Sequence, residues 1–365
     1  MSEQVERIEK IDKAMAVEAT VTEPDIVFYD IRRAPFAVYG LYNYRTEPDF
    51  KRMPDEVAQT VSKGVAGLAY HTAGGRVRFS SDSAYVAIRA EMPKIGRMPH
   101  FALTGSSAFD LYVDDPETGI TRFYKEFRPA FDFTGGYESI VRFGEKKLRH
   151  FTVHFPSYSR VRNLRIGLQQ DATVGEGMKY RNDKPVVYYG SSITQGGCAS
   201  RPGNSYQNVI AQRLGLDYIN LGFSGSGKGE PEIAEYMASL DMMAFICDYD
   251  ANAPTVEHLR GTHLPLYQKI RAKHPDIPYI MISRVHVDRN YADTLERRDV
   301  IIDTYRYARE QGDRNVYFID GESVFRGKYA NMCTVDGVHP NDLGFALMAD
   351  AIGATLERAM TQHLV

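Results

Sequence analysis

Short apolar runs with a repeat of two residues characterise the first 180 residues of the chain. From Arg76 to Met92, and again from Ser106 to Asp115, apolar side chains alternate with polar ones, which is typical of half-buried β-strands. Further runs of this kind are GITRFYKEFRP, ESIVRFG, RHFTVHFPSY and VRNLRIGLQQ. Glycine pairs at 74–75 and 135–136 separate some of the runs and indicate turns. Many short strands at this spacing predict an antiparallel β-sandwich or jelly roll over residues 1–180.

The pattern changes after the polar stretch Tyr180–Pro185. From there on, nearly continuous apolar runs alternate with segments of helical periodicity. The predicted strands are residues 185–192, 216–223, 243–250, 277–285 and 315–323. The predicted helices are residues 205–215 and 231–240, a helix ending near Lys273, residues 292–311, and a final helix with Phe345, Met348, Ile352 and Leu356 on one face. This alternation predicts a doubly wound, flavodoxin-like α/β domain with a five-stranded parallel sheet over residues 181–365.

The composition of the chain excludes several classes of protein. With 365 residues, of which 43% are hydrophobic and 25% charged, the chain can bury a core, so it is not a disordered or low-complexity protein. The 44 basic and 47 acidic residues leave a net charge of −3, which offers no basic field for nucleic acid. No apolar run is long enough to cross a membrane. The charged start MSEQVERIEK lacks the apolar core of a signal peptide, so we expect a cytoplasmic protein, or an exported one if a leader was removed.

Cysteine and histidine residues form no metal or disulfide pattern in the sequence. Cys198, Cys247 and Cys333 are few, odd in number and without a CxxC pair, which argues against a disulfide framework or structural zinc. Cys198 is expected to pack rather than react, because no histidine partner accompanies it in the sequence. His258 and His263 lie five residues apart on a predicted helix, which is a poor ligand spacing, and we expect both at the solvated surface. The sequence therefore predicts no metal and no cofactor.

Candidate chemistry lies where the predicted parallel strands end, because ligands of such sheets bind beyond the carboxyl ends of the strands. The first strand runs into Gly190–Gly197, whose serines sit on a glycine-flanked turn between strand and helix. Such a turn can present a hydroxyl group at the sheet edge, although a plain βα turn has the same composition. The third strand is followed by Asn252, whose amide suits either the stabilisation of an oxyanion or an ordinary Asx turn.

After the fifth predicted strand, Asp336 precedes His339 by three residues on a loop. In this arrangement the carboxylate can hydrogen-bond the imidazole and fix its tautomer. The other ring nitrogen is then free to take a proton from a serine. The pattern is weak when taken alone, because these residue types also make ordinary loops.

The second strand exits into a glycine-rich loop that is close to the phosphate-binding pattern GxxxxGK[ST]. Gly222, Gly227 and Lys228 are in register, but Gly229 stands where a hydroxyl must bind magnesium. We therefore favour the interpretation that these glycines let a backbone N–H approach a reacting group. A nucleotide-dependent enzyme stays as an alternative.

Taken in order, these strand ends resemble the SGNH (GDSL-type) hydrolase family over about half of the chain, from Pro185 onward. The first family block, G-D-S-x-S/T-x-G, is matched by GSSITQG, with Ser192 in the position of the nucleophile. The later blocks are matched by Gly225, Asn252, and Asp336 with His339. Two positions depart from the family: Ser191 stands where Asp is usual, and DANA replaces GxND. The N-terminal half resembles the β-sandwich of one branch of the family, marked by Gly105 and by Phe109-Asp110-Leu111-Tyr112.

The resemblance implies a serine esterase that works through an acyl-enzyme. Ser192, His339 and Asp336 would form the catalytic triad, and the oxyanion hole would consist of the backbone N–H groups of Ser192 and Gly225 with the Asn252 amide. Family members with such a sandwich are mostly esterases, often acting on acylated carbohydrates. Because the sequence has no long apolar insertion for a fatty chain, we expect a short acyl group such as acetyl, on a small-molecule or oligosaccharide alcohol.

Three points stay open at this stage. Arg201, in the polar loop 198–203, is a candidate contact for the alcohol portion of the substrate, or else a surface arginine. An acyltransferase would use the same site, with an alcohol in place of water. A carbohydrate-binding protein with an inactive hydrolase domain is the alternative from another class. No protein partner and no oligomeric state are predicted.

Overall fold

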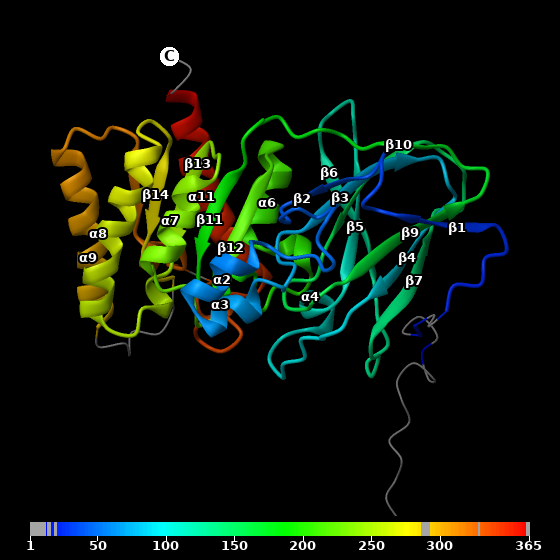
Figure 1. Cartoon of the computed structure of the whole chain (residues 1–365), viewed down its shortest axis with the longest axis horizontal. Helices are drawn as coiled ribbons and strands as arrows, with labels where there is room; N and C mark the ends of the chain where they lie inside the picture. Colours follow the sequence, from blue (N-terminus) through cyan, green and yellow to red (C-terminus); the bar gives the residue numbers. More distant parts are fainter. Residues whose placement is uncertain (1–11, 13–15, 18–19, 286–292, 328, 363–365) are drawn as a thin grey trace, which may run out of the picture.

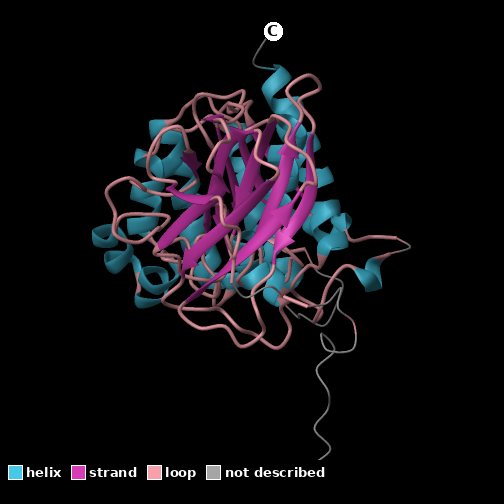
Figure 2. Ribbon diagram, turned by 90° about the vertical axis from the view of Figure 1, so that its right-hand side faces the viewer, coloured by secondary structure: helices cyan, strands magenta, loops and turns pink. Residues whose placement is uncertain are grey.

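The computed structural model describes residues 12, 16–17, 20–285, 293–327 and 329–362. Within these residues, antiparallel sheets make up the N-terminal half, and a parallel sheet flanked by helices makes up the C-terminal half (Figure 1). Seen from the side of the antiparallel sheets, their strands lie in front of the helices (Figure 2). The predicted fold class is confirmed.

Two antiparallel sheets form the N-terminal sandwich. In the described residues, one sheet has the strand order β1-β9-β4-β7 and the other the order β10-β3-β8-β5-β6, with β2 paired to β3. Alternate side chains fill the space between them, such as Val77 and Phe79 from β3 and Val86 and Ile88 from β4, which explains the two-residue repeat. The strands are β1 (Ile26–Asp30), β2 (Ala37–Tyr39), β3 (Arg76–Ser81), β4 (Tyr85–Glu91), β5 (Phe109–Asp114), β6 (Thr121–Phe127), β7 (Gly136–Arg142), β8 (Arg149–His154), β9 (Asn163–Gln169) and β10 (Val174–Glu176).

Helices interrupt the N-terminal half where the sequence pattern predicted only strands. They are α2 (Asp55–Val61), α3 (Lys63–Leu68) and α4 (Leu103–Ser106). Helices α2 and α3 do not pack in the sandwich: Ala58 and Val65 belong to the apolar core that contains Leu221 and Phe223 of the other half. The expectation of strands alone was wrong here, because a short helix needs few apolar residues of its own when a distant element covers it.

The C-terminal half is built on a parallel sheet with the predicted topology. In the described residues its strand order is β12-β11-β13-β14-β15, which is the flavodoxin-like order. Strand β11 lies between β12 and β13, with Gly190 opposite both Gly222 and Asp248. The strands are β11 (Val186–Gly190), β12 (Tyr218–Gly222), β13 (Ala244–Asp248), β14 (Tyr279–Ile282) and β15 (Val316–Ile319).

Helices cover both faces of the parallel sheet. One face packs against α6 (Tyr206–Leu214) and α11 (Asp342–Gln362). The other packs against α7 (Pro231–Ser239), α8 (Val256–Lys273) and α9 (Thr294–Glu310), together with α2 and α3. Short helical turns complete the half: α5 (Ser192–Gln195), α10 (Gly321–Val324), η2 (Pro202–Asn204), η3 (Asp250–Asn252) and η4 (Ala330–Met332). The helix beginning predicted at residue 292 lies outside the described residues.

Two further sequence expectations can be compared with the structure. Among the described helices, none combines the length and the apolar character needed to cross a bilayer. The surface position expected for His263 was wrong: its side chain is buried, and its Nδ1 lies 2.8 Å from Thr304 Oγ1. His263 faces α9, so the polar ring is accommodated by a partner hydroxyl that no pattern within α8 reveals.

Candidate active site

The glycine-flanked turn after β11 presents Ser192 at the carboxyl edge of the parallel sheet, where β11 lies between β12 and β13. Ser191 caps α5, because its hydroxyl accepts a hydrogen bond from the Ile193 N–H at 3.2 Å. Ser192 is the first residue of α5 and stays half-buried. Ser191, which replaces the usual family Asp, therefore shapes the turn and leaves the Ser192 hydroxyl free for another partner.

That partner is His339, on the loop before α11. Ser192 Oγ lies 3.0 Å from His339 Nε2, and His339 Nδ1 lies 2.7 Å from Asp336 Oδ2. The other oxygen, Asp336 Oδ1, accepts the backbone N–H groups of Val338 at 3.0 Å and His339 at 2.8 Å. The structure thus joins the three predicted side chains in one hydrogen-bonded chain.

The ionisation of Asp336 determines the direction of these bonds. Burial acts to raise the pKa of this carboxyl, but hydrogen bonds from the backbone and ring of His339 and from Val338 outweigh it and lower the pKa to about 2. An ionised carboxylate only accepts hydrogen bonds, so His339 Nδ1 must donate. In the neutral ring Nε2 is then the acceptor, and it can receive the Ser192 proton.

The loop after β12 carries Gly225 at the same edge of the sheet, since β12 pairs in parallel with β11. The turn is closed by the N–H groups of Ser226 and Gly227, which donate to Phe223 O at 2.9 and 3.0 Å. Gly225 is exposed, with φ +64°, a backbone conformation that suits glycine. Within the described part of the chain, no acceptor binds its N–H group. Because Ser224 N donates to Gln195 Oε1 at 3.0 Å, the loop is tied to α5 and hence to Ser192.

Asn252 joins the same edge of the sheet from η3, after β13. Its Nδ2 donates to Phe223 O at 2.9 Å, the carbonyl that also closes the Gly225 turn. An amide nitrogen carries two hydrogens, so one remains for a ligand. The η3 turn is held from behind by Arg297, whose guanidinium donates to Asp250 O and Ala253 O, both at 2.9 Å.

The phosphate-loop alternative finds no support in the packing of this segment. A Cβ on Gly227 would overlap Gly190 O, so the loop lies directly against the end of β11. Lys228 O accepts a hydrogen bond from His258 Nε2 at 2.8 Å, and Lys228 N donates to Glu230 Oε2. The glycines therefore allow close packing on the sheet, and the N–H groups of residues 226–229 in the loop already have acceptors within the protein.

The N-terminal half supplies contacts to this edge that the sequence did not indicate. Tyr158 OH donates to Ser192 O at 3.1 Å, and Gln195 Nε2 lies 3.1 Å from His71 Nδ1. Burial, followed by the charge of Arg52, lowers the pKa of His71 to about 3, so the ring is neutral and can accept from the amide. Gln195 stands inside the GSSITQG block, but no local signal marks Tyr158 or His71.

Arg52 is a second unpredicted contact from the N-terminal half. It is buried, and its guanidinium donates to Gly222 O at 2.6 Å and to Leu68 O at 2.7 Å. The guanidinium also lies 4.5 Å from the centre of the Phe223 ring. Arg52 thereby fixes the end of β12, from which the Gly225 loop departs.

Arg201, which the sequence left open between a contact with the substrate alcohol and a surface position, packs against the sandwich. Its guanidinium contacts the sandwich: it bonds Tyr112 OH, lies 3.6 Å from Asp110 Oδ2 and stacks 3.7 Å from the Phe123 ring centre. Asp110 Oδ2 also accepts the N–H of Gly203 at 2.9 Å. These contacts give Arg201 a role in joining the two halves, and its contact with the substrate alcohol stays a prediction.

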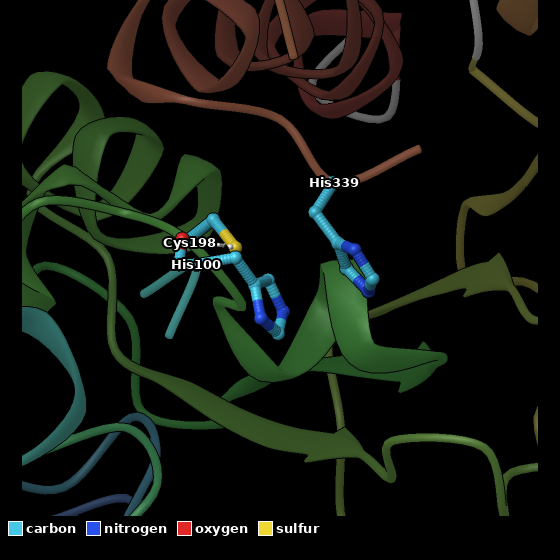
Figure 3. Close-up of side chains that lie close together, drawn as sticks. All are labelled: His100, Cys198 and His339. Atoms are coloured by element: carbon cyan, nitrogen blue, oxygen red, sulfur yellow. Dashed lines mark hydrogen bonds between the residues drawn. The ribbon is translucent and has the colours of Figure 1, made fainter. Parts of the chain in front are cut away.

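Cys198 is buried near the triad and has a histidine neighbour that is remote in the sequence. His100 comes from the N-terminal half, and its ring centre lies 5.6 Å from that of His339 (Figure 3). Cys198 Sγ lies 3.6 Å from His100 O. Burial, with the charge of Asp336 adding to it, raises the pKa of Cys198 to about 12, so the side chain is a thiol and not a nucleophilic thiolate.

Comparison with known protein families agrees with the fold of the two halves. Residues 183–357 match the GDSL-like lipase/acylhydrolase family, and residues 26–174 match GxDLY, the N-terminal domain of SGNH-hydrolase-type esterases. No curated protein matches the chain.

Solved structures with the same fold include several esterases. A protein from Bacteroides ovatus assigned to the GDSL-like lipases is 26% identical, with a TM-score of 0.83 over 92% of this chain and 98% of that chain. A salicylyl-acyltransferase from a tetracycline biosynthetic pathway is 20% identical, with a TM-score of 0.75 over 94% and 99%. A family two carbohydrate esterase from Clostridium thermocellum, in complex with cellohexaose, is 12% identical, with a TM-score of 0.60 over 89% and 99%. The last two similarities show the fold alone.

The chain therefore belongs to the SGNH (GDSL-type) hydrolases, in the branch with an N-terminal GxDLY domain, and is a carboxylic ester hydrolase.

Proposed function

We propose that this protein hydrolyses short-chain acyl esters, chiefly acetyl esters of a carbohydrate or another small polar alcohol, with Ser192 as nucleophile. The observation that carries the proposal is the hydrogen-bonded chain from Ser192 Oγ through His339 to Asp336, with links of 3.0 and 2.7 Å. Such a chain activates a hydroxyl that is otherwise a poor nucleophile.

The first half of the reaction forms an acyl-enzyme. His339 Nε2 takes the Ser192 proton as Oγ attacks the ester carbonyl, and Asp336 stabilises the resulting imidazolium. The N–H groups of Ser192 and Gly225 and the free Asn252 amide hydrogen donate to the oxyanion. The imidazolium then returns its proton to the leaving alcohol, and the carbonyl re-forms.

The second half releases the acid. Water gives a proton to His339 Nε2 and attacks the acyl carbonyl, and the same donors hold the second oxyanion. Collapse of this intermediate returns the proton to Ser192 Oγ and frees the carboxylic acid. An alcohol in the place of water would transfer the acyl group instead, through the same steps.

The choice of substrates rests on chemistry and on the neighbours of similar fold. The sequence contains no long apolar insertion to bind a fatty chain. Among the neighbours, one carbohydrate esterase binds cellohexaose and another is an acetyl xylan esterase from Butyrivibrio proteoclasticus. We therefore infer that acetylated oligosaccharides are the substrates to test first.

Hydrolysis of p-nitrophenyl acetate, butyrate and octanoate by the wild type, Ser192→Ala and Ser191→Ala tests the proposal. We expect rates that fall with chain length and a loss of about 10⁴-fold or more in Ser192→Ala. Ser191→Ala is the matched control, since its hydroxyl only caps α5 and its loss removes about 1 kcal/mol of stability. Equal activity in Ser192→Ala would exclude Ser192 as nucleophile. Product analysis with an added sugar acceptor separates hydrolysis from acyl transfer.

A further inference from the structure

Three side chains beside the triad bring together atoms that bind soft metal ions. A ring nitrogen of His100, the sulfur of Cys198 and a ring nitrogen of His339 all lie within 4.8 Å of one another. They come from three separate loops: the one between β4 and α4, the one after α5, and the one before α11. Figure 3 shows the two imidazole rings near each other, with the Cys198 side chain beside His100.

The chemistry of this set favours zinc. Two imidazoles and one thiolate form a three-ligand site that leaves the fourth tetrahedral position open. With Zn–N near 2.1 Å and Zn–S near 2.3 Å, ligand atoms of a tetrahedral site lie about 3.5 Å apart. Because the atoms now lie within 4.8 Å of one another, the three groups must approach by up to about 1.3 Å. His100 is exposed and can move toward the other two.

The surroundings of two of the ligands also fit a metal site. The Asp336 carboxylate accepts from His339 Nδ1 at 2.7 Å, which is the outer contact that orients metal-binding histidines and leaves Nε2 for the ion. Cys198 adopts φ +74°, although it is not a glycine. A residue with a side chain kept in this strained backbone conformation suggests a function for that side chain.

We propose that His100, Cys198 and His339 bind a zinc ion, and that the bound ion switches off ester hydrolysis. The inhibition rests on the proposed role of His339, whereas the metal site itself does not. On binding, the Cys198 thiol loses its proton to solvent, and the two neutral rings donate lone pairs, so a Zn²⁺ ion and a thiol become a zinc thiolate and a free proton. His339 Nε2 then holds the metal, and it can no longer take the proton of Ser192.

The test uses the full chain, freed of metal by a chelator and then titrated. Co²⁺ serves as the spectroscopic probe for binding, because a cobalt–thiolate bond gives a charge-transfer absorption that neither water nor histidine ligands produce. Zn²⁺ is titrated against p-nitrophenyl acetate hydrolysis. The variants are His100→Ala and Cys198→Ser, with His274→Ala as the matched control, since its Nε2 lies 3.0 Å from Ala238 O, outside the three-ligand group.

We expect a thiolate band in the wild type and in His274→Ala that is absent from Cys198→Ser. We also expect Zn²⁺ to inhibit the wild type reversibly, and the inhibition to weaken at least about 10-fold in His100→Ala, which should keep its metal-free activity. Mg²⁺, which prefers oxygen ligands, should not inhibit.

The outcomes separate the proposed metal site from the proposed esterase activity. No thiolate band, or inhibition by Zn²⁺ that is unchanged in both cluster variants, would overturn the metal site. A thiolate band without inhibition would overturn the inhibitory role and leave the site. Failure of the esterase proposal would show independently, as equal activity of Ser192→Ala and the wild type in the absence of metal.

Discussion

The Asn252 amide at the sheet edge has two hydrogens, one that holds the neighbouring loop and one that can take part in the proposed reaction. One amide hydrogen goes to Phe223 O at 2.9 Å, which holds the η3 turn against the loop that carries Gly225. The second Nδ2 hydrogen lies at the same edge of the sheet. It can therefore donate a hydrogen bond to the oxyanion. The same side chain thus fixes the loop and completes the proposed hole.

Replacing Asn252 tests this division at the scale of one residue. Asn252→Ala should lower kcat by about 10²–10³-fold, the usual effect of losing one oxyanion donor, with a much smaller change in KM. Asn252→Asp keeps the shape but has no donor at neutral pH, so it should lose as much. Steady-state kinetics on p-nitrophenyl acetate give the answer. An alanine variant with unchanged kcat would remove Asn252 from the mechanism.

His263 makes stability depend on pH. Burial lowers its pKa to about 4, whereas a histidine in the unfolded chain titrates near 6.5. Between these two pH values the unfolded chain binds more protons than the folded one. The contribution of His263 to the free energy of unfolding is therefore complete above about pH 6.5 and is lost as the pH falls toward 4. The loss can reach about 3 kcal/mol.

His263→Gln should therefore reduce the acid sensitivity of the fold. Glutamine retains a polar atom for Thr304 but does not titrate, so the free energy of unfolding should fall less between pH 7 and pH 4.5 than in the wild type. Urea unfolding at several pH values measures this difference. Parallel curves for the two proteins would show that His263 does not titrate as inferred.

At the scale of elements, helix α3 of the N-terminal half packs closely against the loop that carries Gly225. A Cβ at Gly64 would overlap Ser226 Oγ and lie 3.0 Å from Ser226 Cβ, whereas a Cβ at Gly67 would meet nothing within 4 Å. The two glycines share one short helix. They therefore form a matched pair for the coupling between α3 and the proposed oxyanion hole.

Gly64→Ala should displace the Gly225 loop and lower kcat, on the order of 10-fold, because small shifts of an oxyanion donor are costly. It should also cost about 1–3 kcal/mol through overpacking. Gly67→Ala should leave kcat unchanged and raise stability by about 0.4–1 kcal/mol. Kinetics and urea unfolding of the pair measure both effects. Equal kcat in the two variants would contradict the coupling.

At the scale of the whole molecule, Asp110 joins the sandwich to the active-site half. This buried carboxylate lies 2.8 Å from His154 Nδ1 and accepts the Gly203 N–H at 2.9 Å, with Arg201 at 3.6 Å. Asp110 and Tyr112, two of the residues that marked the family branch in the sequence, therefore contact the active-site half. Asp114, on the same strand, is also buried, but it pairs with Arg78 and Thr152 inside the sandwich.

The variants Asp110→Ala and Asp114→Ala should distinguish an effect on folding stability from an effect on the arrangement of the active site. Each leaves buried partners unpaired, so each should cost about 3–5 kcal/mol. Only Asp110→Ala removes contacts to Arg201 and Gly203 in the 198–204 loop, so only this variant should lower the kcat of the protein that remains folded. Thermal unfolding and kinetics at a temperature where both variants are folded provide the comparison. The same loss of kcat in both would argue against a specific role of the interface.

Much of the fold and the core of the candidate site followed from the sequence. The repeat of two residues predicted the sandwich strands, and the alternation of apolar runs with helical segments predicted the parallel sheet, because burial on one or both faces of an element imposes a local period. Parallel strands end at one edge, so Ser192, Asn252 and His339 could be expected at the same edge of the sheet.

Other features depended on how the two halves pack. The sequence predicted strands where α2 and α3 form and a surface position for His263, and it left the surroundings of Arg201 open. Each outcome depends on a partner from a distant segment: the parallel-sheet core packs against α2 and α3, α9 against His263, and the sandwich against Arg201. The same holds for Tyr158 behind Ser192, and for His100 beside Cys198. The sequence alone determined the elements and the order of the reactive residues, because those leave a local period or motif. Only the tertiary structure decided which remote side chains surround them, because contacts between distant segments leave no local pattern.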